Sequence, residues 1–175
     1  ATYARTNDDM SVGLAASGSG NVPLFAATNV GVSPDTARIT VTPTFTHGGT
    51  SCVGPSQEFL IVVNPTAQVN DPLDQVVCNG DNTAEVVFTT NNTGGTVTYA
   101  WTNDNTSVGL AASGSGNVPL FAAVNIGTAP DTARITVTPT FTHGGTSCVG
   151  PSQEFLIVVN PTAQVNDPLD QVVCN

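Results

Sequence analysis

The side chains best suited to chemistry in this chain are four cysteines that recur at one fixed interval. Cys52 and Cys148 are 96 residues apart, and so are Cys78 and Cys174. No Cys-x-x-Cys motif and no closely spaced cysteine and histidine occur, which disfavours a zinc site. In an extracellular chain, cysteines at such regular places predict a disulfide framework, and four cysteines permit three pairings.

Two disulfide pairings compete, and unpaired buried thiols are the third alternative. If domains join at the repeated Asn-Pro-Thr segment, Cys78 and Cys148 belong to one domain and close a loop of about 70 residues. Such a bridge stabilises a fold by about 4 kcal/mol in the chain-entropy model. Cys52 and Cys174 would then pair outside this 175-residue segment. The rival scheme joins Cys52 to Cys78 and Cys148 to Cys174 across the joint, and we disfavour it because the chain must double back.

The two histidines occupy the same turn sequence in the two halves of the chain. His47 and His143 both lie in Thr-His-Gly-Gly-Thr-Ser-Cys. Catalysis would need a nucleophile and an orienting acid that converge on the imidazole. The sequence contains no Gly-x-Ser-x-Gly, no His-Glu-x-x-His and no glycine-rich phosphate loop. We therefore expect loop histidines, no catalytic residue and no enzymatic activity.

Oxygen-bearing side chains gather after the Asn-Pro-Thr segment, at Asn70, Asp71 and Asp74. Oxygen ligands near a domain junction could hold Ca²⁺ and stiffen an array of domains. The spacing matches no EF-hand loop, and the alternative is a set of solvated turn carboxylates beside Pro72. Calcium is the only cofactor that the sequence suggests.

The charge and hydropathy of the chain exclude several partners. Three arginines and no lysine stand against 13 acidic residues, which gives a net charge of -10. Such a chain repels nucleic acid at close range, and without lysine it cannot form the Lys-Asn isopeptide cross-links that brace many bacterial pilins. The longest apolar run is Phe59 to Val63, against the roughly 20 residues that span a bilayer. We expect no membrane insertion in this segment.

A near-exact internal repeat organises the whole sequence. Residues 1–79 recur as residues 97–175 with eight positions changed, and four of these changes fall within residues 1–10. Catalytic sites are usually built once, whereas near-identical units in series supply length, spacing or many weak contacts. Two full periods would also need a second counterpart of residues 80–96. We interpret the segment as a window of a longer array, or as a subunit whose ends are completed by its neighbours.

The repeat predicts the domain boundaries. Residues 65–161 form one complete unit between two Asn-Pro-Thr-Ala-Gln segments, because proline ends a strand. Residues 1–64 are then a partial repeat that lacks its first strands, and residues 162–175 are the first strand of a further repeat.

Composition and periodicity predict an all-β fold. Threonine, valine, asparagine, glycine and proline favour short strands joined by turns. Ile135, Val137 and Phe141 alternate with polar residues, and Ser113–Gly116 is interpreted as a flexible turn. Seven strands in one repeat predict a Greek-key sandwich of immunoglobulin type. The expected strands are 75–78, 84–89, 96–102, 108–111, 118–124, 134–142 and 153–159.

Five segments in fixed order carry a resemblance to a known family. They are Asp-Gln-Val-Val-Cys-Asn-Gly (74–80), Tyr-Ala-Trp-Thr-Asn (99–103), Gly-Leu-Ala-Ala-Ser-Gly (109–114), Ile-Thr-Val-Thr-Pro (135–139) and Phe-Leu-Ile-Val-Val-Asn-Pro (155–161). Together they resemble the PKD-like repeats of very long surface proteins of the Bacteroidota. Arg5 departs from the pattern, since the next copy has Trp101 there.

The resemblance implies an extracellular stalk of many immunoglobulin-like domains on a bacterial cell surface. Such proteins are often exported by the type IX pathway and associated with adhesion or gliding. The resemblance also brings an O-glycosylation motif, Asp-Thr-Ala, at Thr36 and Thr132, where a simple turn is the alternative.

The sequence therefore predicts a structural segment of a stalk or filament, in a surface adhesin or fibre. Its expected partners are adjacent copies of the same repeat, including identical chains in a filament. The alternatives are a weak, repeated carbohydrate- or surface-binding module, whose partner would be a glycan, and an accessory region of a larger secreted protein. The unchanged loops 47–57 and 142–153 favour the structural role, because binding copies usually diverge in their loops.

Overall fold

The computed structural model describes residues 1–175 and is all-β, with eleven strands and two three-residue 3-10 helices. No helix has the length and apolar character needed to cross a membrane. The first sheet contains β1 (Thr2–Asn7), β2 (Ser17–Ser19), β3 (Asp35–His47), β4 (Thr50–Val53) and β5 (Gln57–Val63). The second contains β6 (Gln75–Cys78), β7 (Thr96–Asn103), β8 (Ser113–Ser115), β9 (Asp131–His143), β10 (Thr146–Val149) and β11 (Gln153–Asn160). The helices are η1 (Met10–Val12) and η2 (Thr106–Val108).

The chain divides into two compact units that do not follow the repeat boundaries. One unit comprises residues 1–70, 89–99 and 138–152, and the other comprises residues 71–88, 100–137 and 153–175. The predicted domain 65–161 contributes to both units, so its boundaries stay a prediction from the repeat.

The long strand β3 organises the first sheet. β1 pairs along one edge of β3, and both β4 and β5 pair along the other edge. Pro43 lies on β3 at the gap where β4 has ended and β5 has not begun, and its carbonyl accepts a hydrogen bond from Gly54 N at 2.9 Å. Proline is tolerated within this strand because its missing N–H falls at the gap in the pairing.

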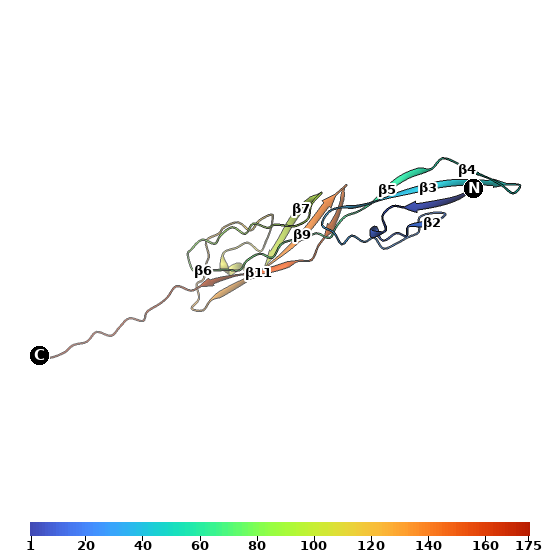
Figure 1. Ribbon diagram of the computed structural model, residues 1–175. Coiled ribbons are helices and arrows are strands. Elements are labelled where there is room, and N and C mark those ends of the chain that lie inside the picture. The colour runs from blue at the N-terminus through green and yellow to red at the C-terminus, as the bar shows by residue number, and fades with distance from the viewer. The chain divides into compact units, whose positions relative to one another are not determined.

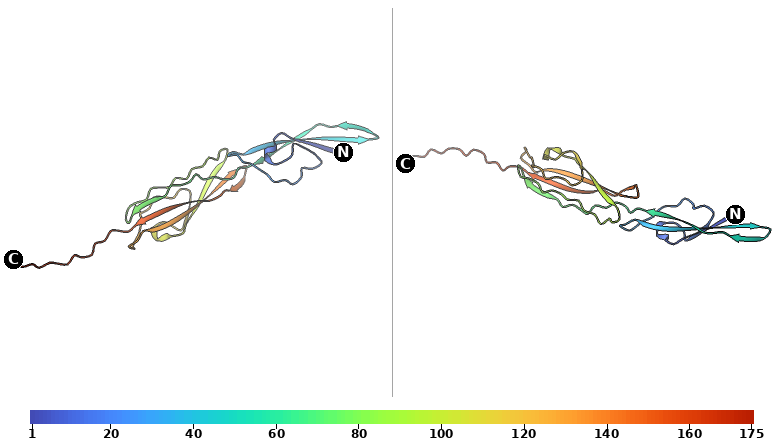
Figure 2. Two further views of the ribbon diagram at one scale, coloured as in Figure 1. Left: turned by 60° about the horizontal axis from the view of Figure 1, so that its bottom comes forward. Right: turned by 90° about the horizontal axis from the view of Figure 1, so that it is seen from above.

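The second sheet repeats the first and adds one strand. β7 to β11 are the counterparts of β1 to β5 at an offset of 96 residues. The added strand, β6, pairs in parallel with β11, from Gln75 opposite Ile157 to Cys78 opposite Asn160 (Figure 1). The first sheet has no counterpart of β6. Residues 162–175, predicted as the first strand of a further repeat, form no strand, and both views of Figure 2 show an extended segment after β11.

Extended segments form an irregular layer over the second sheet. Residues 84–89 and 118–124, predicted as strands, meet at one isolated bridge, Val86 with Val118. A second bridge joins Asn82, just before the first segment, to Ala122. Phe88 from this layer packs edge-on against Phe155 of β11, with ring centroids 6.3 Å apart. The arrangement is sandwich-like, with regular strands in one layer and few ladder hydrogen bonds in the other.

Two predicted elements near the Ser-Gly segment are wrong. Residues 108–111 form no strand, because η2 ends at Gly109 in the left-handed conformation that glycine adopts readily. The Ser113–Gly116 segment, interpreted as a flexible turn, contains strand β8. Gly114 faces the indole of Trp101, and a Cβ there would lie 2.2 Å from Trp101 Cζ2. The glycine therefore permits close packing of strand against ring.

Arg5 takes the place of Trp101 in the first sheet. Its side chain is buried against Gly18, where an added Cβ would lie 2.4 Å from Arg5 Cζ. Arg5 Nη1 donates hydrogen bonds to the carbonyls of Ser19 at 3.3 Å and Asn21 at 3.0 Å. The guanidinium fills the site of the indole, and backbone carbonyls at its rim accept hydrogen bonds from Nη1.

Counterpart residues in the two sheets differ sharply in burial. Phe141 is 0% exposed and Phe155 is 1% exposed, whereas their counterparts Phe45 and Phe59 are 59% and 44% exposed. Residues 65–96 account for much of this difference. A Cβ at Gly95, for example, would lie 2.4 Å from Phe141 Cζ. Residues 1–175 contain no equivalent covering segment for the first sheet.

This difference in burial predicts unequal effects of one substitution at matched positions. Phe141→Ala should lower the free energy of unfolding by about 3–5 kcal/mol, because it empties a closed site in the core. Phe45→Ala, the matched control, should cost under about 1 kcal/mol, because most of that ring is already in water. Denaturant unfolding of the two variants measures both values. Equal losses would show that Phe45 is covered in solution.

Candidate functional site

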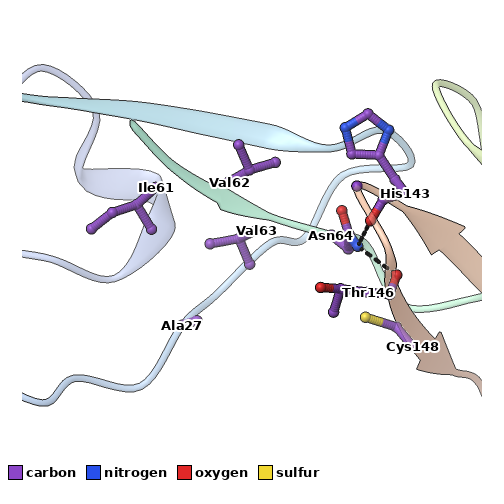
Figure 3. A pocket seen from close by; sticks show the side chains of 9 residues that line it. Ala27, Ile61, Val62, Val63, Asn64, His143, Thr146 and Cys148 are labelled. Atoms are coloured by element: carbon purple, nitrogen blue, oxygen red, sulfur yellow. Dashed lines mark hydrogen bonds between the residues drawn. The ribbon is translucent and has the colours of Figure 1, made fainter. Parts of the chain in front are cut away.

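The segment that follows β5 is fastened by an asparagine to a hairpin turn of the second repeat. Asn64 Nδ2 donates to the carbonyl oxygens of His143 and Thr146, each at 3.1 Å (Figure 3). These carbonyls flank the Gly144-Gly145 turn between β9 and β10. The joint at Asn-Pro-Thr stays a prediction, and the sequence did not indicate which groups Asn64 would bind.

A cavity of about 540 Å³ lies beside Asn64. Ile61, Val62 and Val63 of β5 form an apolar wall, and Cys148 lies on the opposite side (Figure 3). No carboxylate lines the cavity, and the imidazole of His143 points away from the thiol of Cys148. The site therefore lacks the thiol–imidazole pair of a cysteine nucleophile. Its walls suit an apolar side chain or a strand edge.

A second asparagine ties three backbone segments together. Asn92 Oδ1 accepts a hydrogen bond from Gln68 N at 2.7 Å, and its Nδ2 donates to the carbonyls of Thr66 at 3.2 Å and Val32 at 3.3 Å. The same Val32 carbonyl accepts from Thr93 N at 2.9 Å. The sequence gave no sign of this role, because asparagine is frequent throughout the chain.

The four cysteines are unpaired in the structure. Cys52, Cys78 and Cys174 are exposed, and Cys148 is half-buried. Cys148 lies opposite Phe141 near one end of β9, whereas Cys78 lies opposite Asn160, one residue beyond the pair Val159–Asp131 at the other end of β9. A strand rises about 3.3 Å per residue, and a disulfide needs Cα atoms within about 7 Å. The Cys78–Cys148 bridge stays a prediction, and this register weighs against it.

The residues predicted to bind calcium make hydrogen bonds with neighbouring strands. The backbone N–H of Leu156 donates to Asp74 Oδ1 at 2.7 Å, and Asn70 Nδ2 donates to Thr89 Oγ1 at 2.9 Å. Asp71 is exposed, and no group of three or more histidines, cysteines or carboxylates could hold a metal ion. Calcium binding at Asn70, Asp71 and Asp74 stays a prediction, and Asp74 has a structural role that the sequence did not indicate.

Thr36 and Thr132 lie on strands, where the sequence allowed either a glycan site or a simple turn. Each is the second residue of a 13-residue strand, β3 or β9, and each is exposed. O-glycosylation of these two threonines stays a prediction.

A polar cluster surrounds helix η1. Asp9 accepts hydrogen bonds from Ser11 N at 2.8 Å and Ser11 Oγ at 2.6 Å, and the same hydroxyl also bonds to Asp35. The bonds from Ser11 favour the ionised carboxylate and lower the pKa of Asp9 below its usual 3.8. In the second repeat Asn105 replaces Asp9 and accepts from Ser107 N at 3.1 Å. The cluster is therefore a helix cap, and its capping residue carries a charge in the first repeat only, because Asp131 in the second repeat corresponds to Asp35.

Two further groups titrate away from their usual values. The carboxylate of Glu154, through a hydrogen bond and its charge, raises the pKa of Arg134. Burial raises the pKa of Tyr99, and a hydrogen bond with Thr90 partly offsets this effect. The first shift therefore reports an exposed ion pair, and the second reports partial burial.

The Asp9 cap should make the free energy of unfolding depend on pH in the acid range. Because the folded pKa is lower than the unfolded pKa, the stabilising contribution is present above 3.8 and is lost as the pH falls through the folded value. Asp9→Asn, which copies the second repeat, should remove that dependence. Carboxyl NMR titration and unfolding between about pH 2 and pH 5 measure it. An Asp9 carboxyl that titrates at or above 3.8 would contradict the assignment.

The hydrogen bonds of Asn64 predict that removing its side chain makes the Gly144-Gly145 turn less protected from hydrogen exchange. Asn64→Ala should lower the free energy of unfolding by about 1 kcal/mol, because two carbonyls lose a partner near solvent. Hydrogen exchange at the Gly144-Gly145 turn should become faster. Asn160→Ala, at the equivalent position of the second repeat, is the matched control. An unchanged exchange rate at the turn would contradict the role of Asn64.

Comparison with known proteins identifies no family for this chain. No protein-family model matches it, and no curated protein and no solved structure matches it either.

Proposed function

We propose that the chain is a structural tandem-repeat segment of an extracellular stalk or filament, in a bacterial surface adhesin or fibre. Each repeat would be an immunoglobulin-like sandwich that supplies length. Chemistry or recognition would belong to other parts of the assembly.

The observation that carries this proposal is that both sheets keep the same exposed polar contacts. Arg38 bonds to Glu58 at 3.2 Å in the first sheet, and Arg134 bonds to Glu154 at 2.8 Å in the second. Hydroxyl pairs recur in the same way, at 2.8 Å each. They are Thr42–Ser56 and Thr46–Ser51 in the first sheet, and Thr138–Ser152 and Thr142–Ser147 in the second.

These contacts lie in water and each adds little to stability. Their repetition means that this part of the exposed surface is the same in both copies. A binding module under selection for a ligand usually varies its exposed loops between copies. Identical surfaces suit a building block whose neighbours are further copies of itself.

The asparagine anchors support a role in spacing. Asn64 and Asn92 hold the segment between the repeats through hydrogen bonds to four backbone carbonyls. Such bonds limit the bending of a connection that two prolines, Pro65 and Pro72, already stiffen. A connection of this kind keeps successive repeats at a constant spacing.

Tandem polypeptides of increasing repeat number test the proposal. Adding one, two or three 96-residue periods should lengthen the particle by a constant increment, roughly 40 Å per repeat for strands of this length. Small-angle scattering and electron microscopy measure the increment. A matched series carrying Asn64→Ala and Asn92→Ala, with the equivalent change in each added period, should give more bent particles. A particle size that does not grow linearly with repeat number would refute the stalk function.

A further inference from the structure

Strand β8 lies at one edge of the second sheet and has no strand on its outer side. It pairs only with β7, from Ser113 opposite Thr102 to Ser115 opposite Ala100. Ser113 and Ser115 are exposed, and Gly114 between them is half-buried. We propose that β8 pairs antiparallel with β8 of a second copy of the chain, so that strand addition joins two chains side by side.

The pairing of β8 with β7 fixes which of its backbone groups face outward. Asn103 N donates to the carbonyl of Ala112 at 2.8 Å, so these two residues form a hydrogen-bonded pair of the ladder. Bonded and non-bonded pairs alternate in an antiparallel ladder. Gly114 therefore directs its backbone groups toward β7, whereas the N–H and C=O groups of Ser113 and Ser115 point away from β7. The outward groups are those that a further strand would bond.

A second copy of β8 presents the same groups in the complementary order. About a two-fold axis at Gly114, Ser113 of each copy would lie opposite Ser115 of the other. Each of these pairs would exchange both of its N–H···O=C bonds, because both residues point outward. The contact is therefore self-complementary and requires no change in either strand.

The segment that contains β8 has no charged side chain, although the chain has a net charge of -10. No Asp, Glu, Lys, Arg or His occurs in residues 106–130. Two carboxylates from outside the segment bond to it, Asp131 at Ser107 and Glu85 at Asn117, and neither bonds to β8. Edge strands that avoid pairing often carry charges or proline. Strand β8 has neither, so like charges on the strand itself do not oppose the pairing of two copies.

The first sheet has the same edge, but a guanidinium occupies it. Strand β2 has the sequence of β8, and Ser19 is the counterpart of Ser115. The Ser19 carbonyl, which faces outward by the same register, accepts a hydrogen bond from Arg5 Nη1 at 3.3 Å. The positive charge of Arg5 therefore lies beside an acceptor that a new strand would need. A charged group at the edge disfavours strand addition.

Trp101 leaves the corresponding acceptor of β8 free. Its indole packs across Gly114, where a Cβ would lie 2.2 Å from Cζ2, and its Nε1 is buried without a hydrogen-bond partner. The Ser115 carbonyl therefore receives no bond like the one from Arg5 to Ser19. The exchange of arginine for tryptophan between the repeats thus makes a capped edge into an open one. One chain then has a single open edge of this kind, which limits the assembly to pairs.

This inference goes beyond the proposed function, because it concerns contacts between chains rather than the length of one chain. In a stalk, the contact would link neighbouring stalks at the repeats that carry tryptophan. The two proposals can fail separately. A tandem polypeptide that lengthens linearly while single chains stay monomeric would leave the stalk function standing and remove the pairing of β8.

Self-association of the 175-residue chain tests the proposal directly. In sedimentation velocity with a reducing agent, which prevents disulfides between chains, monomers should give way to dimers as the concentration rises. In hydrogen exchange, the amides of Ser113 and Ser115 should become protected in the dimer, whereas the Gly114 amide, which faces β7, should be protected in both states. Monomers at every concentration would overturn the proposal. So would dimers in which Ser113 and Ser115 stay unprotected.

Two substitutions of Ser115 form a matched pair of variants. Ser115→Pro removes the outward N–H and leaves the ladder with β7 intact, because an edge strand tolerates proline where its N–H faces solvent. It should weaken dimerisation by roughly tenfold or more, since the two-fold axis removes the bond twice. Ser115→Ala keeps the backbone donor and should change dimerisation by less than about twofold. Equal effects would overturn the proposed contact.

Exchanging the residue that distinguishes the two edges tests the roles of Arg5 and Trp101. Trp101→Arg copies the first repeat, whose fold accommodates a guanidinium over Gly18, and should give monomers. Arg5→Trp copies the second repeat and should open the edge of β2, so that chains with two open edges form oligomers larger than dimers. Sedimentation velocity measures both results. Dimers that persist in Trp101→Arg, or Arg5→Trp chains that form nothing larger than dimers, would overturn the proposal.

Discussion

The structure depends on covering the apolar side of a sheet built around a 13-residue strand. In the second repeat, residues 65–96 supply this cover, with Phe88 against Phe155 and Gly95 against Phe141. The first repeat has the same strands, but its Phe45 and Phe59 are partly in water. Burial of such rings is the largest favourable term available to a small domain, so one sequence gives two environments according to whether its cover is present.

Strong period-2 patterning predicted the regular strands well. The alternating residues Ile135, Val137 and Phe141 are all buried, and the predicted strand 75–78 agrees with β6 residue for residue. The Ser-Gly strand β8 could not be predicted from periodicity, because its glycine is required by the indole of Trp101 from another strand. The segments 84–89 and 118–124 have the composition of strands, yet their ladders are interrupted. Several of their side chains are buried in the core, whereas their backbones form only isolated bridges.

The roles of the candidate site residues were harder to predict from the sequence than the strands. Asp74 was interpreted as a candidate calcium ligand, yet its carboxylate accepts the N–H of Leu156, a contact 82 positions away in the chain. Asn64 and Asn92 donate hydrogen bonds to backbone carbonyls, and every residue type has such a carbonyl, so the sequence does not identify these partners. The cysteine spacing suggested a loop of one domain, whereas strand register puts Cys78 and Cys148 toward opposite ends of β9. In each case the sequence did not show which residues far apart in the chain lie opposite one another.

Identical segments give this chain two strand edges of the same sequence, those of β5 and β11. Residues 66–79 and 162–175 present the same groups, and the edges of β5 and β11 accept the same groups. Because the contacts are identical, affinity does not determine which edge residues 66–79 occupy. The connectivity of the chain determines it. A tethered segment acts at an effective concentration of about a millimolar, and residues 66–79 therefore occupy β11 before any free copy can. The pairing of β6 with β11 therefore completes the second sheet within one chain.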